Sequence, residues 1–189
     1  MNTEGVNRGY LKIEGAVRAF NFDFRGKTVL DIGSSTGGFT ELALKLGAKK
    51  VIAVEKGSHQ MKAPLRFDSR IELNEKTDIF DFPLSKEIDI VVADVSFLSL
   101  TKVLNYLKKL PNKNADFLVM LKPQFEARED QLNKGIVKNE KIRREIIKNF
   151  ETWLKNNGYA IIKKRDNDLA GRHGNVERFY YLHSARGNI

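Results

Sequence analysis

The chain has 189 residues, with 33 Lys and Arg against 24 Asp and Glu and a formal net charge of +9, so it can bury one hydrophobic core and should favour a polyanionic partner. Cysteine is absent, which excludes disulfide scaffolds, thiolate metal sites and cysteine nucleophiles, and we expect no metal cofactor. There is no signal-peptide pattern and no apolar stretch near the roughly 18 residues that span a bilayer, so the sequence favours a cytoplasmic protein that does not enter membranes. Nucleic acid is the leading partner, and the alternative is that the charge serves only solubility.

Short β-branched runs alternate with amphipathic stretches along the chain. Strands are expected at 28–32, 51–54, 70–75, 88–94 and 116–121. Helices are expected at 7–22, 37–46, 58–64, 99–110 and 139–157. The last two apolar runs, 159–165 and 176–183, have no helix between them and should pair as an antiparallel hairpin at one sheet edge. The pattern predicts one Rossmann-like α/β domain over 1–189, with a mostly parallel seven-stranded sheet, an antiparallel last strand and helices on both faces.

The first expected strand runs into a glycine-rich turn and then an amphipathic helix, in the sequence VLDIGSSTGGFTELAL. Such a turn lets the backbone approach a ligand, and the helix N-terminus offers free N–H groups. A P-loop is disfavoured because Phe39 stands where its lysine belongs, and the dinucleotide fingerprint fails because Ser35 takes its second glycine position. S-adenosylmethionine remains as the expected ligand, with a glycine turn beside a solvated acid as the alternative. The residues expected to bind it are Asp31, Gly33, Ser34, Ser35, Thr36, Gly37, Gly38 and Phe39.

Further cofactor contacts are expected at the ends of the next two strands. Glu55 lies about 20 residues beyond the turn, where an acid can accept both ribose hydroxyls, and Lys56 adjoins it. Asp78 follows the third strand at a position that often holds the adenine. For Asp78 a surface turn carrying an acid is the competing interpretation.

Two charged residues end the fourth and fifth expected strands. Asp94 and Lys122 should lie at the carboxyl edge of the sheet, where open α/β sheets bind ligands, and Asp94 is also expected to contact the cofactor. A lysine after an apolar strand is costly to bury unless it is paired, and Asp94 is its candidate partner. The Asp94-Val-Ser-Phe run lacks the Asn/Asp-Pro-Pro-aromatic pattern of amino-group methylation. A ribose hydroxyl, whose proton a lysine can take or whose alkoxide it can stabilise, suits the pair; a purely structural pair is the alternative.

Five segments together resemble the TlyA (haemolysin A-like) branch of the FtsJ-type 2′-O-methyltransferases: Arg8-Gly-Tyr-Leu-Lys12, DIGSSTGGFT, VADVSFLSL, LKPQFEA and GNVERF. The resemblance implies methylation of ribosomal RNA at ribose oxygens by a Lys-Asp-Lys-Glu tetrad, which falls on Lys12, Asp94, Lys122 and Glu177. It makes Lys122 the central base or alkoxide stabiliser, with Asp94 and Glu177 orienting it. Lys12 would hold the hydroxyl or add positive field.

The sequence departs from this family in two places. Members usually carry an N-terminal S4-type RNA-binding domain, whereas here an N-terminal helical segment, 1–24, already carries the first catalytic motif, so we expect a catalytic domain without S4. The segment DLAGRHGNVERF adds Arg172, His173 and Arg178, for which phosphate contact and a solvated hairpin are equally open. Other basic residues are expected on outer faces, where solubility is the commoner role: Lys108, Lys109, Lys138, Lys141, Arg143 and Arg144.

Two further functions compete with an RNA methyltransferase. A haemolysin-like membrane-active protein is disfavoured because the helix expected at 139–157 has the apolar stripe of an ordinary sheet-covering helix. A non-catalytic module that binds S-adenosylmethionine or RNA would be indicated by loss of a tetrad member, and all four are present. RNA, in free form or in ribosomal subunits, is therefore the expected partner, and no oligomeric state is predicted.

Overall fold

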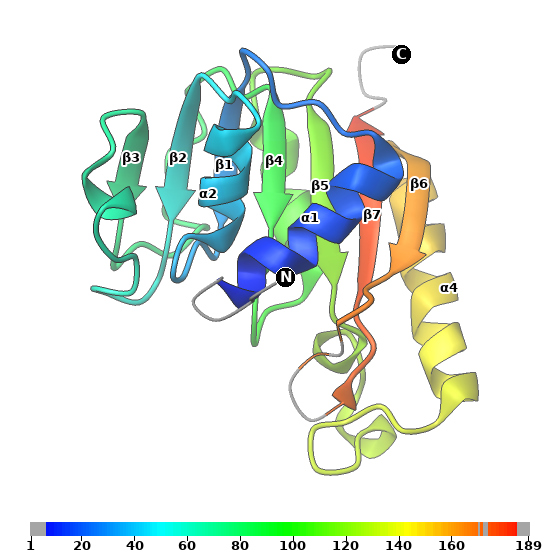
Figure 1. The fold of residues 1–189 in the computed structure, drawn as a ribbon. Coiled ribbons are helices and arrows are strands. Elements are labelled where there is room, and N and C mark those ends of the chain that lie inside the picture. Colours follow the sequence, from blue (N-terminus) through cyan, green and yellow to red (C-terminus); the bar gives the residue numbers. More distant parts are fainter. Residues whose placement is uncertain (1–6, 170, 172–173, 185–189) are drawn as a thin grey trace.

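A single seven-stranded sheet forms the centre of the computed structural model, which describes residues 7–169, 171 and 174–184 (Figure 1). Its strand order is β3-β2-β1-β4-β5-β7-β6. The strands are β1 (Thr28–Ile32), β2 (Lys50–Val54), β3 (Ile71–Asn74), β4 (Ile90–Ala93), β5 (Asp116–Leu121), β6 (Tyr159–Asp166) and β7 (Arg178–Ser184). The expected strands and the Rossmann-like α/β architecture are confirmed.

The first five strands are parallel, and the chain reverses only at its end. β7 lies between β5 and β6 and runs antiparallel to both, which leaves β6 at the sheet edge. The predicted terminal hairpin is thus confirmed. Because the five parallel strands share one direction, their carboxyl ends meet along one edge of the sheet, at the bottom of Figure 1.

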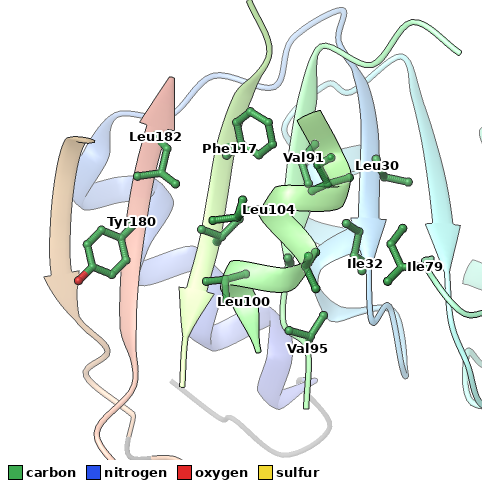
Figure 2. Packing of buried hydrophobic residues seen from close by; sticks show 14 of the residues in the cluster. Leu30, Ile32, Ile79, Val91, Val95, Leu100, Leu104, Phe117, Tyr180 and Leu182 are labelled. Atoms are coloured by element: carbon green, nitrogen blue, oxygen red, sulfur yellow. The ribbon is translucent and has the colours of Figure 1, made fainter. Parts of the chain in front are cut away.

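Helices cover both faces, as expected. α1 (Arg8–Phe20) and α2 (Gly38–Lys45) pack on one face, and α3 (Leu100–Tyr106) and α4 (Glu140–Asn156) pack on the other. Alternation along β1 sends Val29 toward the first pair of helices and Leu30 and Ile32 toward the second. Figure 2 shows the second core, where α3 lies over Leu30, Ile32 and other strand side chains. Each fully buried Leu or Ile contributes about 1.5–3 kcal/mol, so these two cores hold the sheet edge in place.

One expected helix, 58–64, is absent, and that prediction was wrong. The backbone there is irregular, with φ of +56° at His59, and only a short 3-10 turn, η1 (Leu65–Phe67), follows. Pro64 has no N–H to donate to a helical hydrogen bond, and the residue before a proline is disfavoured in the helical conformation. Within the part of the chain that the structure describes, no helix is long and apolar enough to cross a bilayer.

The long stretch after β5, 123–138, contains two 3-10 turns, η3 (Pro123–Phe125) and η4 (Glu129–Gln131), and an isolated bridge between Asn133 and Ile136. It lies beyond the carboxyl edge of the sheet, beside the turn that joins β6 to β7 (Figure 1). The loop is therefore placed at the same edge as the ends of the parallel strands.

Gly38 allows α1 and α2 to pack closely, and this contact predicts a stability effect. A Cβ added at Gly38 would lie 2.5 Å from Tyr10 N and 2.8 Å from the carbonyl carbon of Gly9. We expect Gly38→Ala to destabilise the fold by about 1–3 kcal/mol because neither backbone can give way. The matched control is Gly15→Ala in α1, where the nearest atom would be 3.4 Å away and the helix should gain about 0.5–1 kcal/mol. Urea unfolding measures both, and equal effects of the two substitutions would contradict this account.

Candidate active site

The glycine-rich turn connects β1 to α2, and alternate residues in it have positive φ angles. Gly33, Ser35 and Gly37 have φ values of +75°, +47° and +90°. A Cβ at Gly33 would lie 3.0 Å from the backbone oxygen of Asp94, so the turn packs directly against the end of β4. The positive φ angles explain why glycine occurs at positions 33 and 37, because residues other than Gly, Asn and Asp rarely adopt such angles.

Close approach of a ligand, which the sequence suggested for these glycines, does not explain all of them. The space beside Gly37 is taken by the Leu65 side chain, and that beside Gly38 by the α1 backbone. The Phe39 ring is buried in the core, with its centroid 6.2 Å from that of Phe179. Any ligand contact from Phe39 must therefore come from its backbone. Thr36 faces α1 instead, where its Oγ1 accepts a hydrogen bond of 2.8 Å from Asn7 Nδ2.

Asp31, at the end of β1, is a fully buried carboxyl group with one free oxygen. Thr40 Oγ1 donates to Asp31 Oδ2 at 2.6 Å, but Oδ1 has no partner among the described residues. Burial raises the pKa of Asp31 to about 7, against an ordinary value of 3.8. The nearby Ser34 hydroxyl is likewise buried and lacks a described partner. A free buried acceptor of this kind fits a cationic group such as an amino acid's ammonium, so the donor set is compatible with the expected cofactor.

Glu55, at the end of β2, is tied to the glycine turn. Its Oε2 accepts a hydrogen bond from Ser35 N at 2.8 Å, and its Oε1 accepts from Gly57 N at 2.6 Å. Oε1 also accepts a hydrogen bond from Gln60 Nε2 at 3.3 Å, so the free acceptor position is on Oε2, and a second hydroxyl would have to displace the Gln60 amide. Lys56 forms an ion pair of 3.0 Å with Asp78, which also accepts from Phe80 N, and this backbone hydrogen bond and the lysine lower the pKa of Asp78. The predicted cofactor residues at β1, β2 and β3 therefore line one edge.

Lys122 follows β5 and is buried in an ion pair. Its Nζ lies 2.6 Å from Asp94 Oδ1 and donates a hydrogen bond of 2.7 Å to Ser96 Oγ. The partner that the sequence suggested for this lysine is the one that the structure places beside it. Because Asp94 also adjoins Gly33, the Lys122–Asp94 pair borders the glycine turn.

Lys12 and Glu177 form a second buried pair from opposite ends of the chain. Lys12 Nζ donates to Glu177 Oε2 at 2.7 Å, and both residues are nearly excluded from solvent. Taken alone, Lys12 would have been interpreted as a solvated helix lysine, so its burial is informative. A buried ion pair is expensive to form and contributes little to stability by itself, which favours a role in binding or chemistry.

Strand register brings the two pairs together. Leu121 of β5 pairs with Arg178 of β7 in antiparallel register, so Lys122 and Glu177 lie opposite each other one step further along. The structure thus gathers all four tetrad residues that the sequence suggested at the carboxyl ends of β4 and β5.

Glu126, which was not predicted as a site residue, makes hydrogen bonds that hold the loops after β4 and β5 together. Glu126, in the loop after Lys122, accepts hydrogen bonds from Leu100 N at 2.5 Å and Ser99 Oγ at 2.8 Å, and it thereby caps α3. Burial raises the pKa of its carboxyl group, although these hydrogen bonds oppose the shift. The cap fixes the loop after β5 to the loop after β4, which carry Lys122 and Asp94.

Two aromatic residues stand beside the Lys122–Asp94 pair. The Phe97 side chain is 91% exposed, its φ is +60°, and its ring centroid lies 5.2 Å from that of Phe125. The Phe125 ring in turn lies 5.9 Å from Lys122 Nζ. A phenylalanine so exposed, with a backbone φ in the left-handed region, is unusual, so Phe97 is a candidate contact surface at this edge of the site.

Two of the basic residues form ion pairs within the fold. Arg143 was expected on an outer face, and that prediction was wrong: it is buried and forms an ion pair of 2.6 Å with Asp166. Arg178 binds the same carboxylate at 2.6 Å, so it is not a free phosphate ligand. Arg172 and His173 lie outside the described residues.

Other residues of the site carry only weak signals in the sequence. The side chains of Asn7, Thr40 and Ser96 form hydrogen bonds to the glycine turn, to Asp31 and to Lys122, respectively. Of these, only Asn7 has a local signal, because asparagine commonly precedes a helix as its N-cap. Thr40 and Ser96 act across the fold and have none.

The chain belongs to the FtsJ-like methyltransferase family, whose model matches residues 5–184. The family resemblance of the sequence motifs is thereby confirmed. Within the family the chain is similar to proteins named TlyA. It is 33% identical to the 23S rRNA (cytidine-2′-O)-methyltransferase TlyA of Campylobacter jejuni, with 93% of this chain and 70% of that protein covered. It is 35% identical to the 16S/23S rRNA (cytidine-2′-O)-methyltransferase TlyA of Mycobacterium tuberculosis, covering 94% and 68%.

Other relatives agree on the fold. A protein of Brachyspira hyodysenteriae named Hemolysin A is 36% identical over 93% of this chain and 75% of its own length. A solved structure from Lactococcus lactis superposes with a TM-score of 0.89 at 34% identity, covering 95% of this chain and 88% of that one. A methyltransferase structure from Aquifex aeolicus, at 16% identity and a TM-score of 0.64, shares the fold. The chain spans 65% of the length of a Bacillus subtilis relative that is 37% identical to it.

Proposed function

We propose that the protein transfers a methyl group from S-adenosylmethionine to a ribose 2′-hydroxyl of RNA, with ribosomal RNA as the substrate. The observation that carries the proposal is the pair of buried ion pairs, Lys122–Asp94 and Lys12–Glu177, at the strand ends beside the glycine turn. The printed names of two TlyA relatives, which are rRNA (cytidine-2′-O)-methyltransferases, support the choice of ribose and of ribosomal RNA. The described site residues all belong to one sheet with its covering helices and loops, so we also propose that the chain acts as a single methyltransferase domain. We further propose that it acts in the cytoplasm, where ribosomes lie.

Within this proposal the cofactor would be held by the first half of the sheet. Asp31 Oδ1 would receive its ammonium, Glu55 would accept from its ribose, and Asp78 with Lys56 would lie toward its adenine. When bound, S-adenosylmethionine supplies a methyl group activated by a positive sulfur. The glycine turn, which packs against Asp94, would hold the cofactor next to the strand ends that carry the tetrad.

Lys122 then acts on the hydroxyl group of the substrate. A ribose hydroxyl is a poor nucleophile; as its oxygen bonds to the methyl carbon, the bond from that carbon to the cofactor's sulfur breaks and the hydroxyl proton is released to solvent. The Lys122 ammonium, oriented by Asp94 and Ser96, stabilises the negative charge that develops on the oxygen during this step. Lys12, oriented by Glu177, adds positive potential from the other side of the same edge.

Phe97 provides a platform for the base of the target nucleotide, and its substitution tests the contact with RNA. Bases stack on exposed aromatic rings, and each such contact is worth about 1–3 kcal/mol. We expect Phe97→Ala to raise the KM for RNA by about tenfold or more while the Kd for S-adenosylmethionine stays unchanged. The control is Phe67→Ala, an exposed phenylalanine on η1, which should leave the KM for RNA unaltered. Equal effects of the two substitutions would remove Phe97 from the RNA surface.

The proposed function is tested by transfer of labelled methyl groups from S-adenosylmethionine to free rRNA, ribosomal subunits and tRNA. A methylated 2′-oxygen cannot attack the adjacent phosphate, so the modified position resists alkaline cleavage and can be mapped. Label in a ribose of ribosomal RNA is the expected result. Label in protein or in a base, or cofactor binding with no transfer to any RNA, would refute the proposal.

A further inference from the structure

The turn that leads into β7 presents Glu177, and its backbone is held at every residue from 175 to 177. Asn175 O accepts a hydrogen bond from Gly171 N at 2.8 Å, and Glu177 O accepts from Asn167 N at 2.8 Å. Between them, Val176 O accepts from Arg143 Nε at 3.3 Å. The first two contacts belong to the β6–β7 hairpin itself, and the third, from Arg143 of α4, attaches the segment to a helix.

Gly171 contacts the Glu177 carboxyl group directly. A Cβ added at Gly171 would lie 2.7 Å from Glu177 Oε1, whereas the other oxygen, Oε2, receives the Lys12 ammonium at 2.7 Å. The carboxyl group is thus confined between the Gly171 backbone and Lys12. A shift of Gly171 relative to Glu177 would therefore move this carboxyl group and, through the ion pair, the Lys12 ammonium.

The Asn175 side chain joins this turn to the loop after β5. Its Oδ1 accepts a hydrogen bond from Val137 N at 3.1 Å, and its Nδ2 donates to Gly135 O at 3.2 Å. Asn175 is 5% exposed, so its amide group faces the loop backbone rather than water. The same loop begins at Lys122, so one buried amide connects the segments that carry Lys122 and Glu177.

We propose that Asn175 is a positioning residue that holds the Glu177 carboxyl group, and through it Lys12, in place for the reaction. The inference rests on the proposed methyl transfer and extends it, since Asn175 itself touches neither tetrad pair in any hydrogen bond that the described residues make. An amide with one donor and one acceptor in use is suited to this task, because an apolar side chain of similar size would leave Val137 N and Gly135 O unpaired.

A double-mutant cycle on methyl transfer separates positioning from a general effect on the fold. We expect Asn175→Ala to lower kcat by about 10²-fold, with the Kd for S-adenosylmethionine unchanged, because misplacement by an ångström has that order of effect. In the Glu177→Ala background the same substitution should cost less than about twofold, since the group it positions is already gone. Asn112→Ala is the matched control: its amide also links two backbone segments, through Ile88 O and Asn114 N, but away from the tetrad. Asn112→Ala should leave kcat unaltered.

A second measurement needs no RNA. Acetylation of the folded protein by an amine-reactive ester, mapped by mass spectrometry, reports whether Lys12 is still paired. Asn175→Ala and Glu177→Ala should both raise the rate at Lys12, and Asn112→Ala should not. Multiplicative losses in the cycle, or a Lys12 rate in Asn175→Ala equal to that of the wild type, would overturn the inference. Absence of methyl transfer by the wild-type protein would instead refute the proposed function, and the acetylation rates would still decide the role of Asn175.

Discussion

Replacing Lys122 by alanine is expected to lower the rate of methyl transfer by about 10³-fold, while the affinity for S-adenosylmethionine stays within about twofold of the wild-type value. The substitution removes the cation that stabilises the developing alkoxide and leaves Asp94 without its partner. It changes nothing in the contacts of Asp31 or Glu55, through which we expect the cofactor to bind. Single-turnover transfer, with cofactor binding measured by calorimetry, separates the two quantities.

A matched lysine serves as the control for this experiment. Lys50 also forms a short ion pair, 2.7 Å to Glu72, but it lies at the start of β2, at the opposite edge of the sheet. Lys50→Ala should leave transfer unchanged. If Lys122→Ala retains wild-type activity, or loses cofactor binding to the same degree as activity, Lys122 is not the group that acts on the hydroxyl.

Asp31→Asn is expected to lower the affinity for S-adenosylmethionine by about 10²-fold and to change how stability depends on pH. In the cofactor-free protein, burial raises the pKa of Asp31 to about 7, from an ordinary 3.8. The folded state therefore binds a proton that the unfolded state releases above pH 4, so this group destabilises the fold increasingly from about pH 4 to 7, and fully above that. The asparagine variant lacks this term, so its melting temperature relative to wild type should rise between pH 5 and pH 8.

Cofactor binding should show the complementary pH dependence. An ammonium group binds the ionised carboxylate, so the affinity of the wild-type protein for S-adenosylmethionine should increase as the pH rises through about 7, and that of Asp31→Asn should not. Glu126, whose pKa is also raised, is present in both proteins and cancels in the comparison. Calorimetric titrations at pH 5.5 and 8 measure the effect. Parallel curves for the two proteins would show that Asp31 does not receive the ammonium.

Much of the fold could be predicted because its strands are short apolar runs with clear ends. The sheet, the terminal hairpin and four of the five helices follow from alternation and from helical periodicity. The helix predicted at 58–64 does not form. Met61 in this segment and Leu65 directly after it pack on the glycine turn rather than on one face of a helix. A pattern of apolar residues shows that a segment is buried and does not by itself show its backbone conformation.

The site was predictable where strand ends fixed it, and not where distant segments meet. Asp31 lies near the end of β1, and Asp94 and Lys122 directly follow β4 and β5, so the parallel sheet alone brings them to one edge. Lys12 and Glu177 came from the family resemblance, because nothing local distinguishes them from surface charges. Arg143 and Asn175 were interpreted wrongly or missed, since their partners lie 23 and 38 residues away in the chain.

The insertion of β7 between β5 and β6 also has a consequence for biosynthesis. The residues that we assign to the cofactor end at Asp94, whereas Glu177 enters the sheet only with the last strand. Chains emerge from the ribosome N-terminus first and a domain folds as a unit, so the sheet cannot be completed until β7 has emerged. Tyr180 and Leu182 of β7 belong to the same core as Leu30 and Ile32 of β1, so a chain terminated before β7 would also lack part of the core that supports the cofactor half of the site.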